Sequence, residues 1–284
     1  MSLVVKSISK NHKNENVLDN ISVQFEQGKI YGLLGRNGAG KSTLLNIINN
    51  RSFATSGEVL LNGVPVADSE VALNQLYLMS EDHLFPSFFK IKELFKITER
   101  FYGTFDWALA DEMLHKFGLN ADQRFKNLST GYRTITKLII ALSVPCEYIF
   151  LDEPVLGLDA THREIFYSYL IEVYQQRFCT FVISTHLIEE IANLLEEVII
   201  LYEGKLLQAA SVETILQYAR IVSGPKELVG SYIETLQVLG QKPLGGSLTA
   251  YVYGRLPEKP IEGISILPST LQEYFIQLTS GEEE

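Results

Sequence analysis

Runs of apolar residues alternate with amphipathic segments along most of the chain. The run KIYGLLG (29–35) is typical of a buried strand, and LLNIINN (44–50) places its apolar residues on one face of a helix. The runs YIFL (148–151) and CTFVIST (179–185) indicate two further buried strands. Strands that alternate with helices in this way predict an α/β fold.

Another helix is predicted where the segment LSTGYR (128–133) begins. Either Ser129 or Thr130 is a suitable N-cap, and the apolar positions that follow recur at helical spacing. Gly131 is unexpected there, because glycine in a helix costs up to about 1 kcal/mol relative to alanine. The glycine at this position therefore requires an explanation other than helix propensity.

The rest of the pattern divides the chain into regions. SGEVLLNGVPV (56–66) predicts a hairpin that turns at Asn62 and Gly63. Residues 82–145 are helical and rich in aromatic side chains, most of which we expect in the core. After residue 206 the composition changes, and residues 207–284 predict a small α/β extension. Its expected elements are the strands ARIVS, LTAYVYG and GISIL and a closing helix, TLQEYFIQLT.

Composition narrows the class of protein. A chain of 284 residues, 46% of them hydrophobic, is long enough for a well-buried core. Its formal net charge of −10 argues against a nucleic-acid partner. We expect no membrane span, because the chain has no signal-peptide pattern and no apolar run near the roughly 18–20 residues that cross a bilayer. Cys146 and Cys179 lack metal-ligand spacing and are expected to be buried thiols.

The strongest chemical signal is GRNGAGKST (35–43), which lies between a predicted strand and a predicted helix. Strand, Gly-x-x-x-x-Gly-Lys-Ser and helix together form a phosphate-binding loop. Its glycines let backbone N–H groups converge on a phosphate at the positive end of the helix dipole. Lys41 is expected to contact the β- and γ-phosphates, and Ser42 to ligate Mg²⁺. The ATP-binding residues predicted in this loop are Arg36, Asn37, Gly38, Ala39, Gly40, Lys41, Ser42 and Thr43.

A second acidic segment, EYIFLDEP (147–154), supplies the groups that such a loop needs for hydrolysis. Asp152 stands at the carboxyl end of a predicted strand, where open α/β sheets bind ligands. It is expected to hold Mg²⁺ through water. Glu153 is then the predicted general base for the attacking water.

The motifs GRNGAGKST, LSTGY, FLDEP, GLDA and STH occur in an order and at a spacing that resemble the nucleotide-binding subunits of ATP-binding cassette (ABC) transporters. The resemblance covers residues 1 to about 205. It implies a P-loop NTPase of the ABC ATPase type over residues 1–206, with a mixed sheet core, an antiparallel β-subdomain and an α-helical subdomain at about 82–145. The end of the chain resembles, more weakly, the C-terminal extension of bacterial drug- and peptide-efflux ATPases.

The resemblance also assigns roles to single residues. In this family LSTGY is the signature motif, which contacts the γ-phosphate bound to a second subunit, and this implies that Ser129, Thr130 and Gly131 bind ATP in trans. On that reading, the cap groups are left free for an anion and the missing side chain lets backbone approach phosphate. Asp159 matches the D-loop aspartate that shapes the facing site, and His186 matches the switch histidine. His83, His115 and His162 have no such context and are expected on the surface.

Three positions depart from the family pattern. His12 is the only side chain near the usual adenine-stacking aromatic residue, so weaker stacking is expected. Tyr132 and Thr130 replace two variable signature residues. The glutamine that links the site to the membrane subunit has no match in LYLMSEDH (76–83); Glu81, as a possible Mg²⁺ ligand, or Ser80 takes its place.

The resulting hypothesis is an ATPase subunit that uses ATP and Mg²⁺ to power a separate membrane-spanning permease, expected to be an exporter. The family implies a second ATPase subunit, identical or different, and a cytoplasmic location on the inner face of the membrane through the permease. The alternative is a soluble ABC-type ATPase that acts on nucleic acid or the ribosome. A GTPase is disfavoured, because the guanine motif Asn-Lys-x-Asp needs an Asn-Lys pair and the chain has none.

Overall fold

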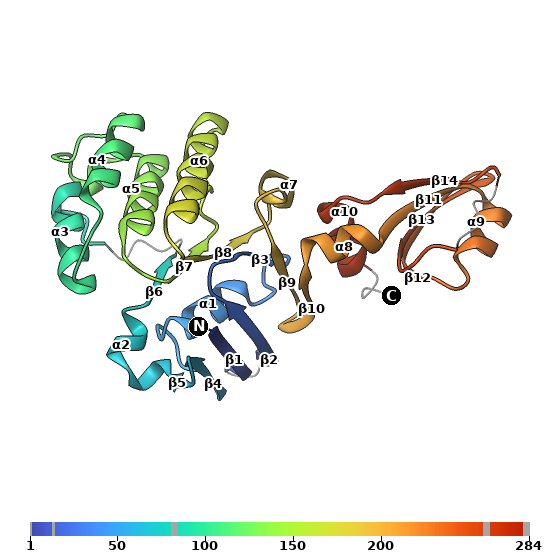
Figure 1. Cartoon of the computed structure of the whole chain (residues 1–284), viewed down its shortest axis with the longest axis horizontal. Helices are drawn as coiled ribbons and strands as arrows, with labels where there is room; N and C mark the ends of the chain where they lie inside the picture. The colour runs from blue at the N-terminus through green and yellow to red at the C-terminus, as the bar shows by residue number, and fades with distance from the viewer. Residues whose placement is uncertain (1, 13–14, 81–84, 258–261, 281–284) are drawn as a thin grey trace. The chain divides into compact units, whose positions relative to one another are not determined.

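The computed structural model describes residues 2–12, 15–80, 85–257 and 262–280 (Figure 1). Two compact units divide the chain: unit 1 contains residues 1–186 and 201–207, and unit 2 contains residues 187–200 and 208–284. The chain therefore enters unit 2 once before the boundary predicted near residue 206. Each unit is described separately below.

The largest sheet has the strand order β10-β9-β3-β8-β7-β6, and its strands β3, β6, β7 and β8 lie wholly in unit 1. Its parallel strands are β3 (Ile30–Leu34), β6 (Leu76–Met79), β7 (Tyr148–Asp152) and β8 (Thr180–Thr185). Every residue of these four strands is buried, which explains their continuous apolar runs. Their carboxyl ends meet at one edge of the sheet, so the loops after β3, β7 and β8 lie together. The chain passes between the units within β9 (Glu197–Tyr202) and β10 (Lys205–Ser211).

A second sheet of unit 1 is antiparallel, in the order β2-β1-β4-β5. It contains β1 (Ser2–His12), β2 (Glu15–Glu26), β4 (Ser56–Leu61) and β5 (Val64–Pro65), followed by the 3-10 turn η1 (Val66–Asp68) and the short helix α2 (Glu70–Leu73). The predicted hairpin joins β4 to β5, and both turn residues, Asn62 and Gly63, have positive φ.

Helices make up the rest of unit 1. They are α1 (Lys41–Ile48), α3 (Ile91–Tyr102), α4 (Trp107–Lys116), α5 (Thr130–Ser143) and α6 (Ala160–Gln176), with the 3-10 turn η2 (Phe125–Asn127) before α5. Ser129 is the N-cap of α5. Phe95 and Phe105 are buried as predicted, whereas Phe88 and Phe101 are exposed. Cys146 and Cys179 are buried free thiols, as predicted.

Unit 2 contains the predicted α/β extension. Its elements are α7 (Ile188–Ile191), α8 (Val212–Tyr218), β11 (Ala219–Pro225), α9 (Lys226–Ile233), β12 (Gln237–Leu244), β13 (Ser247–Tyr253), β14 (Ser265–Pro268) and α10 (Leu271–Ser280). The strands form an antiparallel sheet in the order β12-β13-β11-β14. Side chains of α9, β11 and β13 form its core, among them Val222, Val229 and Val252. The sequence pattern missed α8, α9 and β12.

No helix among the described residues is long and apolar enough to cross a membrane.

Candidate ATP-binding and hydrolysis site

The loop between β3 and α1 has the backbone of a phosphate-binding loop. Gly40 precedes α1 with φ of 97°, and no side chain caps this helix end. A Cβ on Gly40 would lie 2.6 Å from Leu18 Cδ2, so no other residue fits there. Gly38 also has positive φ, and a Cβ there would meet nothing within 4 Å. The backbone N–H groups at the start of α1 therefore face open space without a side-chain cap, which is the arrangement that binds an anion.

A cavity of about 530 Å³ lies beside this loop. It brings together the three segments that the motifs predicted, namely the loop after β3, the end of β7 and the residue after β8. Its lining residues are Val17, Asn37, Gly38, Ala39, Gly40, Lys41, Ser42, Thr43, Asp152, Glu153, Leu156 and His186.

Lys41 provides the positive charge of this cavity. It is 7% exposed, and its Nζ donates a hydrogen bond to the Gly35 carbonyl at 2.7 Å. Burial lowers the pKa of Lys41, and the nearby carboxylates Glu153 and Asp152 oppose that shift. The ammonium is thus held close to the loop backbone, where a bound phosphate would replace lost hydration.

Asp152 fits the role of a metal-binding carboxylate. It is 5% exposed, and its Oδ1 is buried without a hydrogen-bond partner among the described residues. A buried carboxylate oxygen left in this state is costly unless a cation or water occupies the space beside it. The described residues contain no cluster of three or more His, Cys, Asp and Glu side chains that could hold a metal. Mg²⁺ suits a single carboxylate beside a phosphate-binding loop, since it is usually bound by one or two carboxylates with phosphate oxygens and water. Asp152 and Ser42 are the residues that would hold it.

Glu153 and His186 form a hydrogen-bonded pair at the cavity. His186 Nδ1 lies 3.0 Å from Glu153 Oε2, and the side chains are 48% and 15% exposed. Glu153 has φ of 46°, an uncommon value for a residue with a side chain, and its N–H donates to the Ser184 carbonyl at 2.9 Å. Backbone held in this region is typical of functional sites. The pair therefore presents a fixed carboxylate that can accept a proton.

The predicted in-trans residues lie elsewhere. Ser129, Thr130, Gly131 and Asp159 are absent from the lining of the Lys41 cavity. We expected the Ser129 cap to be left free for an anion, and this was wrong. Its Oγ accepts a hydrogen bond from the Tyr132 N–H at 3.3 Å. A hydroxyl that accepts in this way still has its own O–H to donate.

The absence of a side chain at Gly131 also has a cause within the chain. A Cβ there would lie 3.1 Å from the Gly157 carbonyl oxygen, so the start of α5 and the loop before α6 touch backbone to backbone.

Some predicted residues are not brought to the cavity. His12, at the end of β1, and Arg36 are exposed, and neither lines it. Glu81 lies outside the described residues, so its role as a Mg²⁺ ligand stays a prediction. Val17 of β2 lines the cavity, and sequence reasoning missed it because an isolated apolar residue in a strand has no chemical signature.

Substitutions of Val17, which lines the cavity, and of His12, which was predicted to stack on adenine, differ in their expected effects on ATP binding. Val17→Asp should weaken ATP about 3- to 10-fold, because it places a carboxylate on the wall of an anion-binding cavity. His12→Ala should change the dissociation constant less than twofold, since His12 does not reach that wall. Fluorescent-nucleotide titration measures both, with Asn16→Asp as the control for an added charge on an exposed neighbour. A larger loss of ATP affinity for His12→Ala than for Val17→Asp would support the predicted stacking of His12 on adenine.

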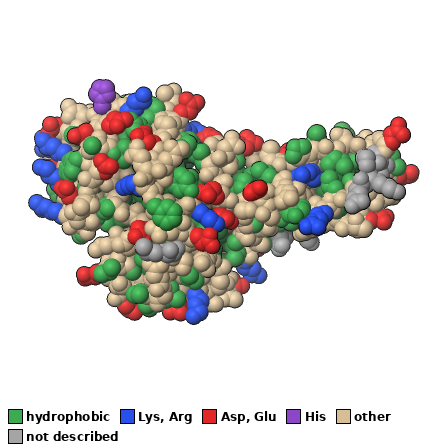
Figure 2. All heavy atoms as spheres, viewed as in Figure 1, with side chains coloured by type: hydrophobic (Ala, Val, Ile, Leu, Met, Phe, Trp, Pro, Cys, Tyr) green, Lys and Arg blue, Asp and Glu red, His purple; other side chains and the backbone are tan. Residues whose placement is uncertain are grey.

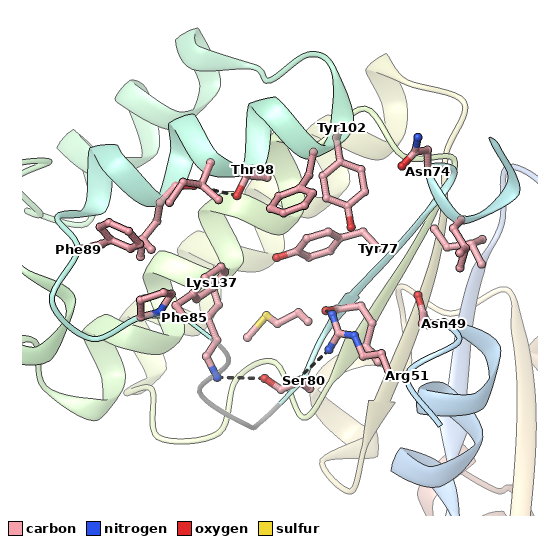
Figure 3. A pocket seen from close by; sticks show the side chains of 18 residues that line it. Asn49, Arg51, Asn74, Tyr77, Ser80, Phe85, Phe89, Thr98, Tyr102 and Lys137 are labelled. Carbon is pink, nitrogen blue, oxygen red and sulfur yellow. Dashed lines mark hydrogen bonds between the residues drawn. The ribbon is translucent and has the colours of Figure 1, made fainter. Parts of the chain in front are cut away.

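A second cavity of unit 1, about 560 Å³, lies between β6, α3 and α5 (Figure 3). Ser80 sits at its wall, where Lys137 Nζ donates to the Ser80 carbonyl at 3.0 Å and an Arg51 N–H donates to Ser80 Oγ at 3.2 Å. Lys137 is only 4% exposed. Ser80 is one of the two candidates for the position that links the site to a membrane subunit. Sequence reasoning missed Lys137 and Arg51, which come from distant segments.

A glycine-rich loop before α1, a buried lysine and a carboxylate at the end of β7 define a P-loop nucleoside triphosphatase. Residues 18–156 match the family model for ABC transporters. The chain thus contains an ABC transporter ATP-binding domain, which is an ATPase, and is homologous to ABC ATP-binding proteins.

Three similar proteins illustrate this assignment. The ABC transporter ATP-binding protein YtrB of Bacillus subtilis (strain 168) is 28% identical over 74% of this chain and 72% of its own length. Nod factor export ATP-binding protein I of Mesorhizobium japonicum is 26% identical over 98% of this chain and 86% of its own length. The dimeric post-hydrolysis structure of the ATP-binding cassette MJ0796, bound to ADP and Pi, has a TM-score of 0.67. It is 22% identical and covers 74% of this chain and 98% of that chain, so it shows the fold alone.

Proposed function

We propose that this chain is the ATPase subunit of an exporter, in which two ATPase subunits work with a separate membrane-spanning permease. The observation that supports the proposal is that the predicted ATP-binding residues fall into two separate groups. The Lys41 cavity can bind a triphosphate, while Ser129, Gly131 and Asp159 lie outside it and are available to a second chain. Their arrangement suits a dimer in which each ATP is bound between two chains.

Hydrolysis then follows from the positions of the chain's own groups. Backbone N–H groups at the start of α1 and the Lys41 ammonium bind the phosphates, and Ser42 and Asp152 would hold Mg²⁺, which offsets phosphate charge when bound. Glu153, oriented by His186, accepts the proton of the water that attacks the γ-phosphate. Loss of the γ-phosphate removes the group that the second chain's Ser129 and Gly131 contact, so the dimer opens.

The cavity beside Ser80 is the proposed contact with the permease. Its lining is mainly apolar, and among the described residues that line it only Arg51 and Lys137 are charged. The exposed side chain of Phe101, 72% accessible, lies at its wall. A hollowed, mainly apolar surface of this kind is typical of a protein-binding site. This contact would place the chain on the cytoplasmic side of the membrane.

A substitution at Phe101 tests the permease contact. When the chain is produced together with a candidate membrane-spanning permease, Phe101→Glu should reduce membrane-bound chain at least tenfold, because the contact would bury a carboxylate against an apolar surface. Phe53→Glu is the matched control, since Phe53 is 80% exposed and does not line this cavity. ATP affinity should stay within twofold for both variants. Equal membrane binding by the two variants would contradict the proposed contact.

The names of similar proteins bear on the direction of transport, and the surface charge bears on the alternative function. Relatives include a protein named for ribose import as well as one named for Nod factor export, and the latter aligns with 98% of this chain. That coverage includes unit 2 and favours an exporter. A role on nucleic acid or the ribosome is disfavoured, because acidic side chains are scattered among the basic ones on the face in Figure 2 and the net charge is −10.

A further inference from the structure

His162, predicted with His83 and His115 to be a surface histidine, lies where three helices meet. It belongs to the first turn of α6, and its side chain is 27% exposed. Its ring stacks on Phe117 at the end of α4, with centroids 5.8 Å apart and an interplanar angle of 28°. Its edge-on neighbour is Tyr132 of α5, at 6.1 Å and 69°. In Figure 1, α5 lies between α4 and α6.

The same histidine holds both oxygens of the Asp159 carboxylate. The His162 backbone N–H donates to Asp159 Oδ1 at 2.9 Å, and His162 Nδ1 lies 2.7 Å from Oδ2. A carboxylate only accepts, so Nδ1 carries the proton in this contact. These two donors, the backbone N–H first, hold the pKa of the Asp159 carboxyl below its usual range. The Asp159 side chain is nevertheless 64% exposed, so its orientation is fixed while one side stays open.

The start of α5 and the loop before α6 also lie close together. A Cβ on Gly131 would lie 3.1 Å from the Gly157 carbonyl, and one on Gly157 would lie 3.8 Å from Thr130 Cγ2. The N-terminus of α5 and the loop that carries Asp159 are therefore packed against each other. His162 adds to this backbone contact a hydrogen bond on one side and ring contacts on the other.

We propose that His162 is a positioning residue that locks Asp159 to the start of α5, so that both elements meet a second subunit as one rigid surface. The proposal rests on the proposed dimeric function. It assigns no contact with ATP to His162, which is absent from the lining of the Lys41 cavity. Loss of His162 should therefore weaken the dimer and slow turnover, with the affinity of the single chain for ATP unchanged.

Three substitutions separate the hydrogen bond from the ring. His162→Asn keeps a donor near the place of Nδ1 and loses the ring, His162→Phe keeps a ring and loses the donor, and His162→Ala loses both. Each is made in the Glu153→Gln chain, and dimer formation is followed by light scattering against chain concentration in millimolar ATP. His115→Ala is the control, because His115 is an exposed histidine of α4 with no side-chain partner among the interactions of the described residues.

His162→Ala should raise the dimer dissociation constant about tenfold, and His162→Phe and His162→Asn should each raise it about threefold, because each keeps one of the two contacts that the link needs. In the chain with Glu153 intact, His162→Ala should lower kcat with KM for ATP nearly constant. Monomer ATP affinity and melting temperature are measured for each variant, so that misfolding is recognised. If the dissociation constant of the His162→Ala dimer is within twofold of the parent value, this proposal alone is overturned. So do His162→Phe and His162→Asn dimers that are both as tight as the parent dimer. A Glu153→Gln parent that stays monomeric in ATP overturns the proposed function and this proposal with it.

Discussion

Lys41→Ala should bind ATP roughly 10- to 150-fold more weakly than the unchanged protein. The expected loss is about 1.5–3 kcal/mol, which is typical of hydrogen bonds to charged groups. The structure supports a value in this range, because the Lys41 ammonium is nearly buried at the loop and burial already lowers its pKa. A phosphate would be the strongest partner available to it. Titration with a fluorescent nucleotide measures the effect directly.

Two controls make this result specific to phosphate. Lys226→Ala removes an exposed lysine of unit 2 and should leave ATP affinity within twofold. Adenosine without phosphates should bind Lys41→Ala and the unchanged protein equally. Since Lys41 also donates to the Gly35 carbonyl, a melting curve must show that the variant is folded. An unchanged ATP affinity in a folded Lys41→Ala protein would exclude a phosphate role for this lysine.

The core of the site could be predicted because its signals are local. The residues from Gly35 to Thr43 are contiguous, and the apolar runs before and after them fix a strand and a helix. Asp152 is the last residue of the buried strand β7 and His186 follows the buried strand β8, so the geometry of a parallel sheet brings them to the same edge. Local pattern and sheet topology together therefore determine most of the cavity.

What could not be predicted depends on contacts between distant segments. Val17 reaches the cavity from β2, and Lys137 reaches the Ser80 carbonyl from 57 residues along the chain. His162 acquires its role from two aromatic side chains on other helices. None of these residues belongs to a motif, and a lysine or histidine on a helix is ordinarily a solvated side chain. Only the packing of the helices shows which of them are held in place.

The helix opening LSTGYR illustrates both cases. Its pattern predicted the helix and offered Ser129 as one of two caps, and the structure places Ser129 there. The sequence did not show that Gly131 lies against the Gly157 carbonyl of the loop before α6. Glycine at that position thus permits a close contact inside the chain, and any role toward a second chain's phosphate must use the side that this contact leaves open.

Glu153→Gln should bind ATP, lose turnover by at least about 100-fold and accumulate as a dimer. The substitution keeps the shape of the side chain and removes the proton acceptor, and general bases typically contribute 10²–10⁴-fold. It also removes a negative charge close to the phosphates, which favours the closed state. ADP should not support the dimer, because it lacks the phosphate that the second chain is proposed to contact. Gel filtration with light scattering distinguishes the two states.

Adding Ser129→Arg to Glu153→Gln should abolish this dimer, because a long side chain would occupy the proposed γ-phosphate position in the facing site. Ser129→Ala is the matched control: it also removes the cap, which costs α5 about 1 kcal/mol, but it adds no bulk. The Ala variant should therefore still dimerise, more weakly, while both variants bind ATP as monomers through their intact Lys41 cavities.

A Glu153→Gln chain that stays monomeric in millimolar ATP would count against the shared site in the isolated subunit. Equal dimers with ADP and ATP, or an Arg variant that dimerises as well as the Ala variant, would refute the role of Ser129 and Gly131 at the second chain's phosphate.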